Sequence, residues 1–283
     1  GWLNDLARSS RCRLYLMSQV LIIGAGAMGE AIIAGLIKSG TNSGSISILE
    51  KRKERSVEIC AQYGVSELPN LAALSGFAAI FLIVKPQDLA ASIAEISDHI
   101  TTETVLISLA AGKKIAGIEA GLKGKRVPVI RVMPNTPALV GEGMAAISGG
   151  TNCSEKDLAL AEKLLNGTGK VIRVEEDLQD AVTAVSGSGP AYFFRIVEAM
   201  VAAGIELGLT PEDSHQLSIQ TIYGAATMLR DSGKTPSTLR ENVTSPNGTT
   251  AAALKSLNES GIQEIFSAAL LAARDRSREL AQG

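Results

Sequence analysis

Three glycines near the start of the chain carry the clearest chemical signal. They stand in the sequence Gly-Ala-Gly-Ala-Met-Gly at positions 24–29, directly after the apolar run at 20–23. Between a strand and a helix, the first glycine permits a tight turn, the second lets backbone approach a pyrophosphate, and the third allows the helix to pack on the strand. The pattern predicts a dinucleotide site at the positive end of the helix, although a glycine-rich turn without a ligand has the same sequence. The predicted cofactor contacts here are Gly24, Gly26, Ala27, Met28 and Gly29.

The choice of dinucleotide depends on the residues that follow the second predicted strand. Glu50 could accept hydrogen bonds from an adenosine ribose, which favours NAD. Lys51, Arg52 and Lys53 come next and could bind a 2′-phosphate, which favours NADP. A solvated run of charges is the alternative interpretation. We take Glu50, Lys51 and Arg52 as candidate cofactor contacts.

Three more strand ends hold segments that differ from simple turns. The segment at 84–86 follows the most apolar predicted strand, at the carboxyl edge where open α/β sheets bind ligands. The small residues at 110–112 would let a flat nicotinamide approach the backbone, and Met-Pro-Asn-Thr-Pro at 133–137 forms a stiff loop on the same rim. Taken alone, each segment is equally compatible with an ordinary strand-to-helix connection. The candidate cofactor contacts among them are Val84, Lys85, Pro86, Ala110, Ala111 and Gly112.

Two loops interrupt the helical sequence of the C-terminal half. Ser-Gly-Ser-Gly-Pro at 186–190 places two glycines inside apolar sequence, so the backbone must pass close to another group there. The second loop, 243–250, precedes an alanine-rich helix, and Gly248 with two threonines offers N–H groups and hydroxyls suited to a carboxylate. Plain N-capping of that helix by Thr249 is the alternative.

Alternating strands and helices must position these segments. After Val174 the sequence is typical of helices only, with Thr210 as an N-cap and an apolar stripe along the last helix, from Ile262 to Ala273. The sequence therefore predicts an α/β N-terminal domain with a Rossmann-like parallel sheet at 17–174 and an all-α C-terminal dimerisation domain at 175–283. Short apolar runs predict strands at 20–23, 46–49, 79–84, 105–109, 127–132 and 170–174, with helices between them such as 30–39 and 54–63.

The composition of the 283 residues excludes several functional classes. With 27 basic and 29 acidic residues, the chain has no net field to attract a nucleic acid or an anionic membrane, and no apolar run reaches the ~20 residues of a membrane span. Two histidines and three widely spaced cysteines argue against a metal site and favour a reducing, cytoplasmic compartment. Residues 1–16 carry three arginines without periodicity and are interpreted as a non-native or disordered tail, with a transit peptide as the alternative.

From about Met17 to the C-terminus, these segments together resemble the pyrroline-5-carboxylate reductase family. The most specific match is the stretch from Pro236 to Leu254, which contains Ser-Pro-Asn-Gly-Thr-Thr. Val-Lys-Pro-Gln, Met-Pro-Asn-Thr-Pro and Ser-Gly-Ser-Gly-Pro match as well. Asn247 departs from the family, in which a second glycine is common, but Asn tolerates a left-handed backbone.

The resemblance implies hydride transfer from NADPH, or alternatively NADH, to the ring imine of 1-pyrroline-5-carboxylate. The product is L-proline, and the reaction is the last step of proline biosynthesis. A protonated imine is already electrophilic, so catalysis would depend mainly on positioning. The family also implies a homodimer, with a higher homo-oligomer of dimers as the alternative.

Site residues follow by the same resemblance. Thr250 would hydrogen-bond the ring nitrogen, while Ser245, Gly248 and Thr249 would hold the carboxylate. The resemblance also implies that Glu176 lies near the substrate and that Asn70 contacts the adenosine side of the cofactor.

Two other functions fit part of this layout. β-Hydroxyacid dehydrogenases pair a Rossmann domain with a helical one, but need a catalytic lysine one helical turn after a glycine motif. Here Gly187-Ser188-Gly189 is followed by Pro190, aromatic residues and Arg195, without a lysine. A non-enzymatic dinucleotide-sensing protein would use the helical half as an interaction surface. Oxidation of NADPH on addition of the cyclic imine, but not of keto acids, separates the three functions.

Overall fold

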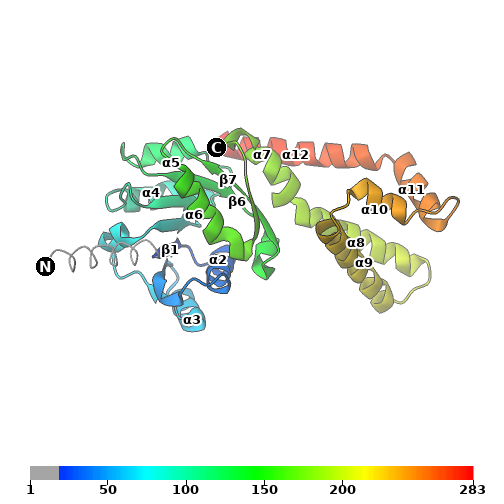
Figure 1. Cartoon of the computed structure of the whole chain (residues 1–283), viewed down its shortest axis with the longest axis horizontal. Helices are drawn as coiled ribbons and strands as arrows, with labels where there is room; N and C mark the ends of the chain where they lie inside the picture. Colours follow the sequence, from blue (N-terminus) through cyan, green and yellow to red (C-terminus); the bar gives the residue numbers. More distant parts are fainter. Residues whose placement is uncertain (1–18, 283) are drawn as a thin grey trace. The chain divides into compact units, whose positions relative to one another are not determined.

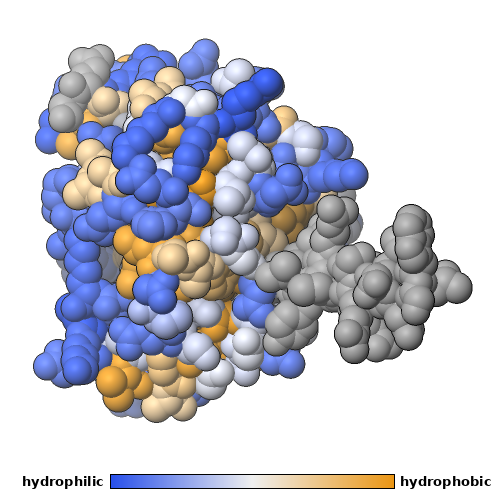
Figure 2. All heavy atoms as spheres, turned by 90° about the vertical axis from the view of Figure 1, so that its left-hand side faces the viewer, coloured by the Kyte–Doolittle hydropathy of each residue, from blue (hydrophilic) through white to orange (hydrophobic). Residues whose placement is uncertain are grey.

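The computed structural model describes residues 19–282, which divide into two compact units (Figure 1). The first unit is the chain up to Gly187 together with the residues from Arg274 onward, and the second unit is Ser188–Ala273. The tail expected at 1–16 lies outside the described residues. Hydrophilic side chains occupy much of the face of the first unit seen in Figure 2, with apolar ones gathered near the middle.

One eight-stranded sheet forms the centre of the first unit, in the order β3-β2-β1-β4-β5-β6-β7-β8. Neighbouring strands are parallel except for β6 and β7, which confirms the expected Rossmann-like α/β fold. The strands are β1 (Val20–Ile23), β2 (Ile46–Leu49), β3 (Ser66–Glu67), β4 (Ala79–Leu82), β5 (Val105–Ser108), β6 (Val129–Met133), β7 (Gly143–Gly149) and β8 (Gly169–Arg173).

The antiparallel strand β7 departs from the wholly parallel sheet that the sequence predicts. Its sequence, Gly-Met-Ala-Ala-Ile-Ser-Gly, has one β-branched residue and gives little strand signal. Only residues 134–142 connect β6 to β7, fewer than the dozen or more that a crossover between parallel strands requires. The chain therefore turns back on itself, and β7 pairs antiparallel to β6.

Helices cover both faces of this sheet. One apolar cluster lies under α2 (Ala27–Lys38), α3 (Lys53–Tyr63) and α6 (Glu155–Leu165), and the other under α4 (Leu89–Ser97) and α5 (Ile115–Gly121). Strand β1 contributes alternate residues to the two clusters, so all four of its side chains are buried. Burial on both faces explains why its sequence is a continuous apolar run.

The second unit is entirely helical and leaves large apolar side chains exposed. The side chain of Thr210 accepts a hydrogen bond from the Asp213 N–H at 3.1 Å, which confirms the predicted N-cap. Phe194 and Ile265 are 66% and 60% exposed, so the unit does not cover its own apolar faces. Its helices are α8 (Gly189–Glu206), α9 (Pro211–Asp231), α10 (Pro236–Asn242), α11 (Thr249–Glu259) and the first part of α12 (Ile262–Gln282).

The segment between β8 and α8 packs on the sheet. It comprises a 3₁₀ turn at Glu176–Leu178, α7 (Gln179–Val182) and a π-helical turn at Thr183–Gly187. The Gln179 amide donates to the hydroxyl of Ser148 on β7 at 2.8 Å. With such contacts, the first compact unit continues as far as Gly187. The domain boundary expected from the sequence, between residues 174 and 175, lies earlier, at the end of the last strand. None of the described helices combines the length and apolar character of a membrane span.

Candidate active site

The glycine turn between β1 and α2 has a separate steric reason for each glycine. Gly24 has φ +95°, and a Cβ there would overlap the carbonyl oxygen of Ile83. A Cβ on Gly29 would overlap the carbonyl oxygen of Gly24. At Gly26, by contrast, a Cβ would meet no atom of the described residues within 4 Å. The first and third glycines are thus required by the fold, and the second leaves space beside the backbone.

The start of α2 offers hydrogen-bond donors to that space. Gly26 is the N-cap residue, and no side chain among the described residues caps the helix. The first N–H groups of the helix, including those of Ala27 and Met28, are therefore available to an anion at its positive end. Strand β1 lies between β2 and β4, where the strand order reverses, and ligands of open α/β sheets bind at this point. The residues fit the pyrophosphate of a dinucleotide.

Glu50 links this turn to the basic run after β2. One carboxylate oxygen accepts the Ala25 N–H at 2.9 Å, and the other accepts the Arg52 N–H at 3.0 Å and its Nε at 3.1 Å. Burial alone would raise the pKa of the Glu50 carboxyl, but the hydrogen bonds from Arg52 and Ala25 outweigh it and lower the pKa. Glu50 is therefore an ionised carboxylate that is already bonded to its own chain.

The other candidates for the adenosine side are exposed at the same edge. Lys51 and Arg52 are exposed after β2. Asn70 is exposed after the neighbouring strand β3 and precedes the 3₁₀ turn at Leu71–Gly76. The three residues follow the carboxyl ends of adjacent strands, which is the arrangement that their predicted roles require.

The candidates for the nicotinamide side follow β4 and β5. Val84, Lys85 and Pro86 lead from β4 into a 3₁₀ turn, with Lys85 exposed. Gly112 has φ +70°, and a Cβ there would lie 3.6 Å from the backbone nitrogen of Ala281 in α12. The end of the last helix therefore occupies the space beside Gly112, which sequence reasoning did not anticipate. Ala110 is buried and Ala111 is exposed.

Glu176 is held by groups from two other elements. Its Oε1 accepts the N–H of Ile115, at the start of α5, at 2.8 Å. The same oxygen accepts a hydrogen bond from Nη1 of Arg131 in β6 at 3.2 Å, and the Arg131 side chain is only 5% exposed. Arg131 is not among the site residues predicted from the sequence, although a lone arginine inside the apolar strand Val-Ile-Arg-Val-Met is a recognisable signal.

Asn135, in the loop after β6, joins two segments of the first unit. Its amide donates to the carbonyl of Ser186 at 3.1 Å, and its Oδ1 accepts the Met144 N–H at 2.8 Å. The same region explains Gly187, where a Cβ would lie 2.5 Å from Cε of Met133. The close backbone approach predicted for the Ser-Gly-Ser-Gly-Pro loop is thus confirmed at Gly187.

The threonine loop, residues 244–250 of the second unit, has an N-cap other than the one proposed from the sequence. Gly248 is the N-cap of α11 with extended backbone (φ −82°, ψ 176°), and Thr249 is already the first helical residue. The capping role considered for Thr249 is therefore wrong. A Cβ on Gly248 would overlap Oγ of Ser245, so a glycine is required for close packing within the loop. Asn247 has φ +59°, the left-handed backbone that this residue type tolerates.

The start of α11 has the chemistry of a carboxylate site. No side chain among the described residues caps the helix, so its first N–H groups are available to an anion. The Thr250 side chain is half-buried in the first turn, while Ser245 and Thr249 are exposed. The loop brings together Ser245, Gly248, Thr249 and Thr250, the four residues that the resemblance implied.

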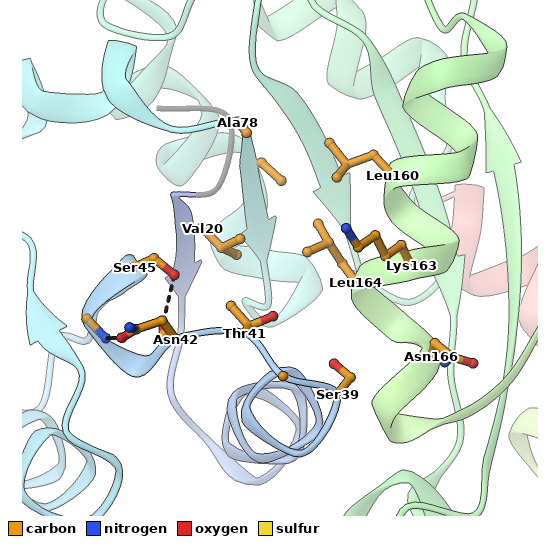
Figure 3. A pocket seen from close by; sticks show the side chains of 13 residues that line it. Val20, Ser39, Thr41, Asn42, Ser45, Ala78, Leu160, Lys163, Leu164 and Asn166 are labelled. Carbon is orange, nitrogen blue, oxygen red and sulfur yellow. Dashed lines mark hydrogen bonds between the residues drawn. The ribbon is translucent and has the colours of Figure 1, made fainter. Parts of the chain in front are cut away.

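A cavity elsewhere in the first unit is not part of this chemistry. It has a volume of about 670 Å³ and is lined by Val20, Ala78 and Ala79 at the amino ends of β1 and β4, with Asn42 and Lys163 at its sides (Figure 3). Ligands of open α/β sheets bind at the carboxyl ends, which are the opposite edge. Among the described residues, no cluster of three or more His, Cys, Asp or Glu side chains could hold a metal ion.

Known protein families match both parts of this chain. A family model described as pyrroline-5-carboxylate reductase dimerisation matches residues 176–280, and one described as NADP oxidoreductase, coenzyme F420-dependent, matches residues 19–112. A pyrroline-5-carboxylate reductase from Corynebacterium melassecola is 41% identical over 268 residues, covering 93% of this chain and 99% of that protein.

Solved structures give the same result. A pyrroline-5-carboxylate reductase from Coxiella burnetii is 36% identical with a TM-score of 0.88, and the match covers 93% of this chain and 98% of that one. The Plasmodium falciparum pyrroline carboxylate reductase with NADP bound is 27% identical with a TM-score of 0.78, at the same coverage. Identity of this level over nearly the full length of both proteins shows that the chain belongs to the pyrroline-5-carboxylate reductase family of NAD(P)-dependent oxidoreductases.

Proposed function

We propose that this chain reduces 1-pyrroline-5-carboxylate to L-proline with NADPH, as the last step of proline biosynthesis. The observation that carries the proposal is the start of α11, where uncapped N–H groups, Gly248 and the Thr250 hydroxyl suit a small cyclic imino acid. Family membership supports the same reaction over the β-hydroxyacid dehydrogenase and binding-protein alternatives.

The residues of the chain bind and orient in this proposal. The N–H groups at the start of α11, with Ser245 and Thr249, hold the substrate carboxylate. The Thr250 hydroxyl accepts the hydrogen bond of the protonated ring nitrogen and so fixes the orientation of the C=N bond. Glu176, held by Arg131 and Ile115, remains a candidate substrate contact.

The glycine turn and the strand ends at 84–86 and 110–112 hold the cofactor, whose reduced nicotinamide supplies the hydride. The imine carbon accepts it, and the ring nitrogen keeps its proton as the product amine. No strong general base is needed, so rate depends on positioning.

Purified protein tests this function directly. We expect oxidation of NADPH, followed at 340 nm, on addition of 1-pyrroline-5-carboxylate, together with formation of L-proline. Keto acids and hydroxy acids should give no turnover. Cofactor binding without turnover of the imine would exclude the reductase and favour a dinucleotide-sensing protein.

We further propose that NADPH is preferred over NADH. Lys51 is an exposed cation at the carboxyl edge, and Arg52, whose Nε pairs with Glu50 at 3.1 Å, keeps 63% of its side chain exposed. The Glu50 carboxylate is only 7% exposed and is bonded to Ala25 and Arg52. A guanidinium and an ammonium bind a 2′-phosphate, whereas a carboxylate engaged elsewhere is less available to a ribose hydroxyl.

Replacing both Lys51 and Arg52 by alanine should raise the KM for NADPH by roughly tenfold more than the KM for NADH, because only NADPH carries the 2′-phosphate. Steady-state kinetics with both cofactors measures this. The double variant Lys156→Ala/Lys170→Ala serves as the control, since it also removes two exposed positive charges, one on α6 and one on β8. Equal effects on the two cofactors would show that the basic run is solvated surface.

The chain is also proposed to form a homodimer through its second unit, with a higher oligomer of dimers as a further possibility. Support comes from the exposed apolar faces of its helices and from the dimerisation model that matches residues 176–280.

We propose a cytoplasmic location, which the free thiols of Cys60 and Cys153 support. We also propose that the chain has no nucleic-acid partner, because its positive and negative charges nearly balance.

Ile265→Glu should weaken the dimer more than tenfold, because it places a carboxylate within an apolar interface. Sedimentation at micromolar concentration measures the association. Val57→Glu on α3 is the matched control, since Val57 and Ile265 are each 60% exposed but only Ile265 lies in the second unit. An active wild-type monomer would contradict the proposal.

A further inference from the structure

Ala25 lies between the first two glycines of the turn. Side chains that follow β2 in the sequence form hydrogen bonds with both its N–H and its carbonyl oxygen. Its N–H donates to Oε2 of Glu50 at 2.9 Å, and its carbonyl accepts Nε of Arg55 at 2.9 Å. Ala25 itself is fully buried. The conformation of the turn is therefore held by two residues that lie 25 and 30 positions later in the chain.

Arg55 is in turn fixed by two other side chains, and a third holds one of them. Its Nη2 pairs with Glu30 of α2, and its Nη1 pairs with Glu58, one helical turn along α3, at 3.0 Å. Glu30 also accepts the Tyr63 hydroxyl at 2.8 Å. The Arg55 side chain is 18% exposed and Glu30 is 27% exposed, whereas Glu58 is 58% exposed. The guanidinium is therefore shielded from water mainly on the side of Glu30. Each guanidinium nitrogen has a different acceptor.

We propose that Arg55 is a positioning residue for the cofactor, acting through the peptide group between Ala25 and Gly26. A trans peptide is planar, and its C=O and N–H point in opposite directions. When Arg55 fixes the Ala25 carbonyl, it also fixes the direction of the Gly26 N–H. Glu50 fixes the preceding peptide in the same way, through the Ala25 N–H.

A Cβ on Gly26 would meet no described atom within 4 Å, so a ligand has room beside this residue and its N–H. An N–H held in advance donates to a pyrophosphate oxygen without first reorienting, and such preorganisation increases affinity. This inference rests on the proposed function, because it assumes that the turn binds a dinucleotide. It predicts a contribution to the pyrophosphate, which NADPH and NADH share, and not to the 2′-phosphate.

Arg55→Lys is the decisive variant. Lysine keeps the positive charge beside Glu30 and Glu58, but its single nitrogen cannot reproduce the planar fork that also reaches Ala25. We expect the dissociation constants of NADPH and NADH to rise by the same factor, about tenfold. The kcat at saturating cofactor should stay within about twofold of wild type, and the melting temperature within roughly 5 °C. Calorimetric titration with each cofactor and thermal unfolding give these values.

Arg173→Lys is the matched control, because it makes the same substitution. Arg173 on β8 also pairs with two carboxylates, Glu155 at 2.8 Å and Glu162 at 2.7 Å, but both lie on α6 and none of the three bonds to the glycine turn. Arg173→Lys should leave both dissociation constants unchanged and keep the melting temperature within the same range as Arg55→Lys. Unchanged affinity in Arg55→Lys, or equal weakening in Arg173→Lys, would overturn the positioning role.

A second comparison separates this inference from the proposed function. If Gly26→Ala weakens both cofactors and Arg55→Lys weakens neither, the turn binds the dinucleotide but Arg55 does not position it. If the wild-type protein binds neither cofactor, the proposed function fails and this inference fails with it. A larger loss for NADPH than for NADH in Arg55→Lys would assign Arg55 to the 2′-phosphate instead and would also contradict it.

Discussion

Thr250→Ala should lower kcat/KM for 1-pyrroline-5-carboxylate by roughly 10- to 100-fold while leaving the affinity for NADPH close to wild type. The variant removes one hydrogen bond to a charged ring nitrogen, which is typically ~1.5–3 kcal/mol, and each ~1.4 kcal/mol corresponds to one decade of rate. Thr250→Ser keeps the hydroxyl and should recover most of the activity. Steady-state kinetics with the imine, together with cofactor titration, measures both effects.

Thr235→Ala is the control for a purely structural loss. The Thr235 side chain is an observed N-cap in the same unit, because it accepts the Thr238 N–H at 3.2 Å. Its loss should cost ~1 kcal/mol of folding free energy without a selective kinetic defect. If Thr250→Ala melts as early as Thr235→Ala and turns over normally, the threonine loop does not bind the substrate.

Gly26→Ala should raise the dissociation constants of both NADPH and NADH by roughly 10- to 100-fold with little change in melting temperature. Gly26 has φ −68° and ψ −166°, which any residue adopts, and no described atom lies near the added Cβ. The methyl group would instead meet the approaching pyrophosphate and disturb its charged hydrogen bonds. Cofactor titration and thermal unfolding test the two halves of this expectation.

Two other glycines calibrate that result. Gly117→Ala, also in open space but on α5, should leave cofactor binding unchanged. Gly29→Ala should unfold or strongly destabilise the protein, because its Cβ would overlap the Gly24 carbonyl. Wild-type cofactor affinity in Gly26→Ala would show that the turn is a structural feature without a dinucleotide.

The features that the sequence predicts well depend on local rules. The strand ranges follow short apolar runs, and the requirement for glycine at position 29 comes from Gly24, five residues earlier. The N-cap at Thr210 depends only on residues 210–213, which are consecutive in the sequence. Family motifs then added the threonine loop, whose residues do come together at the start of α11.

The features that could not be predicted depend on long-range contacts. The bonds from Glu50 and Arg55 to Ala25 connect segments through the packing of β1, β2 and α3, which no local pattern encodes. Strand β7 owes its existence to pairing with β6, because its alanine- and glycine-rich sequence has little strand propensity. At Thr249, residue type suggested a cap, but the extended backbone at Gly248 decided which residue precedes the helix.

The second unit is inserted into the first, since the chain leaves the first unit at Gly187 and returns to it at Arg274. The returning segment makes defined contacts there: Ser277 Oγ donates to Asp180 at 2.7 Å, and the backbone at Leu280–Ala281 lies beside Gly112. These residues follow the helical insertion in the sequence, so the first unit cannot be completed on the ribosome until translation has passed the whole insertion. A chain that stops before Arg274 would lack the contacts with Asp180 and Gly112, and its first unit would remain unfinished.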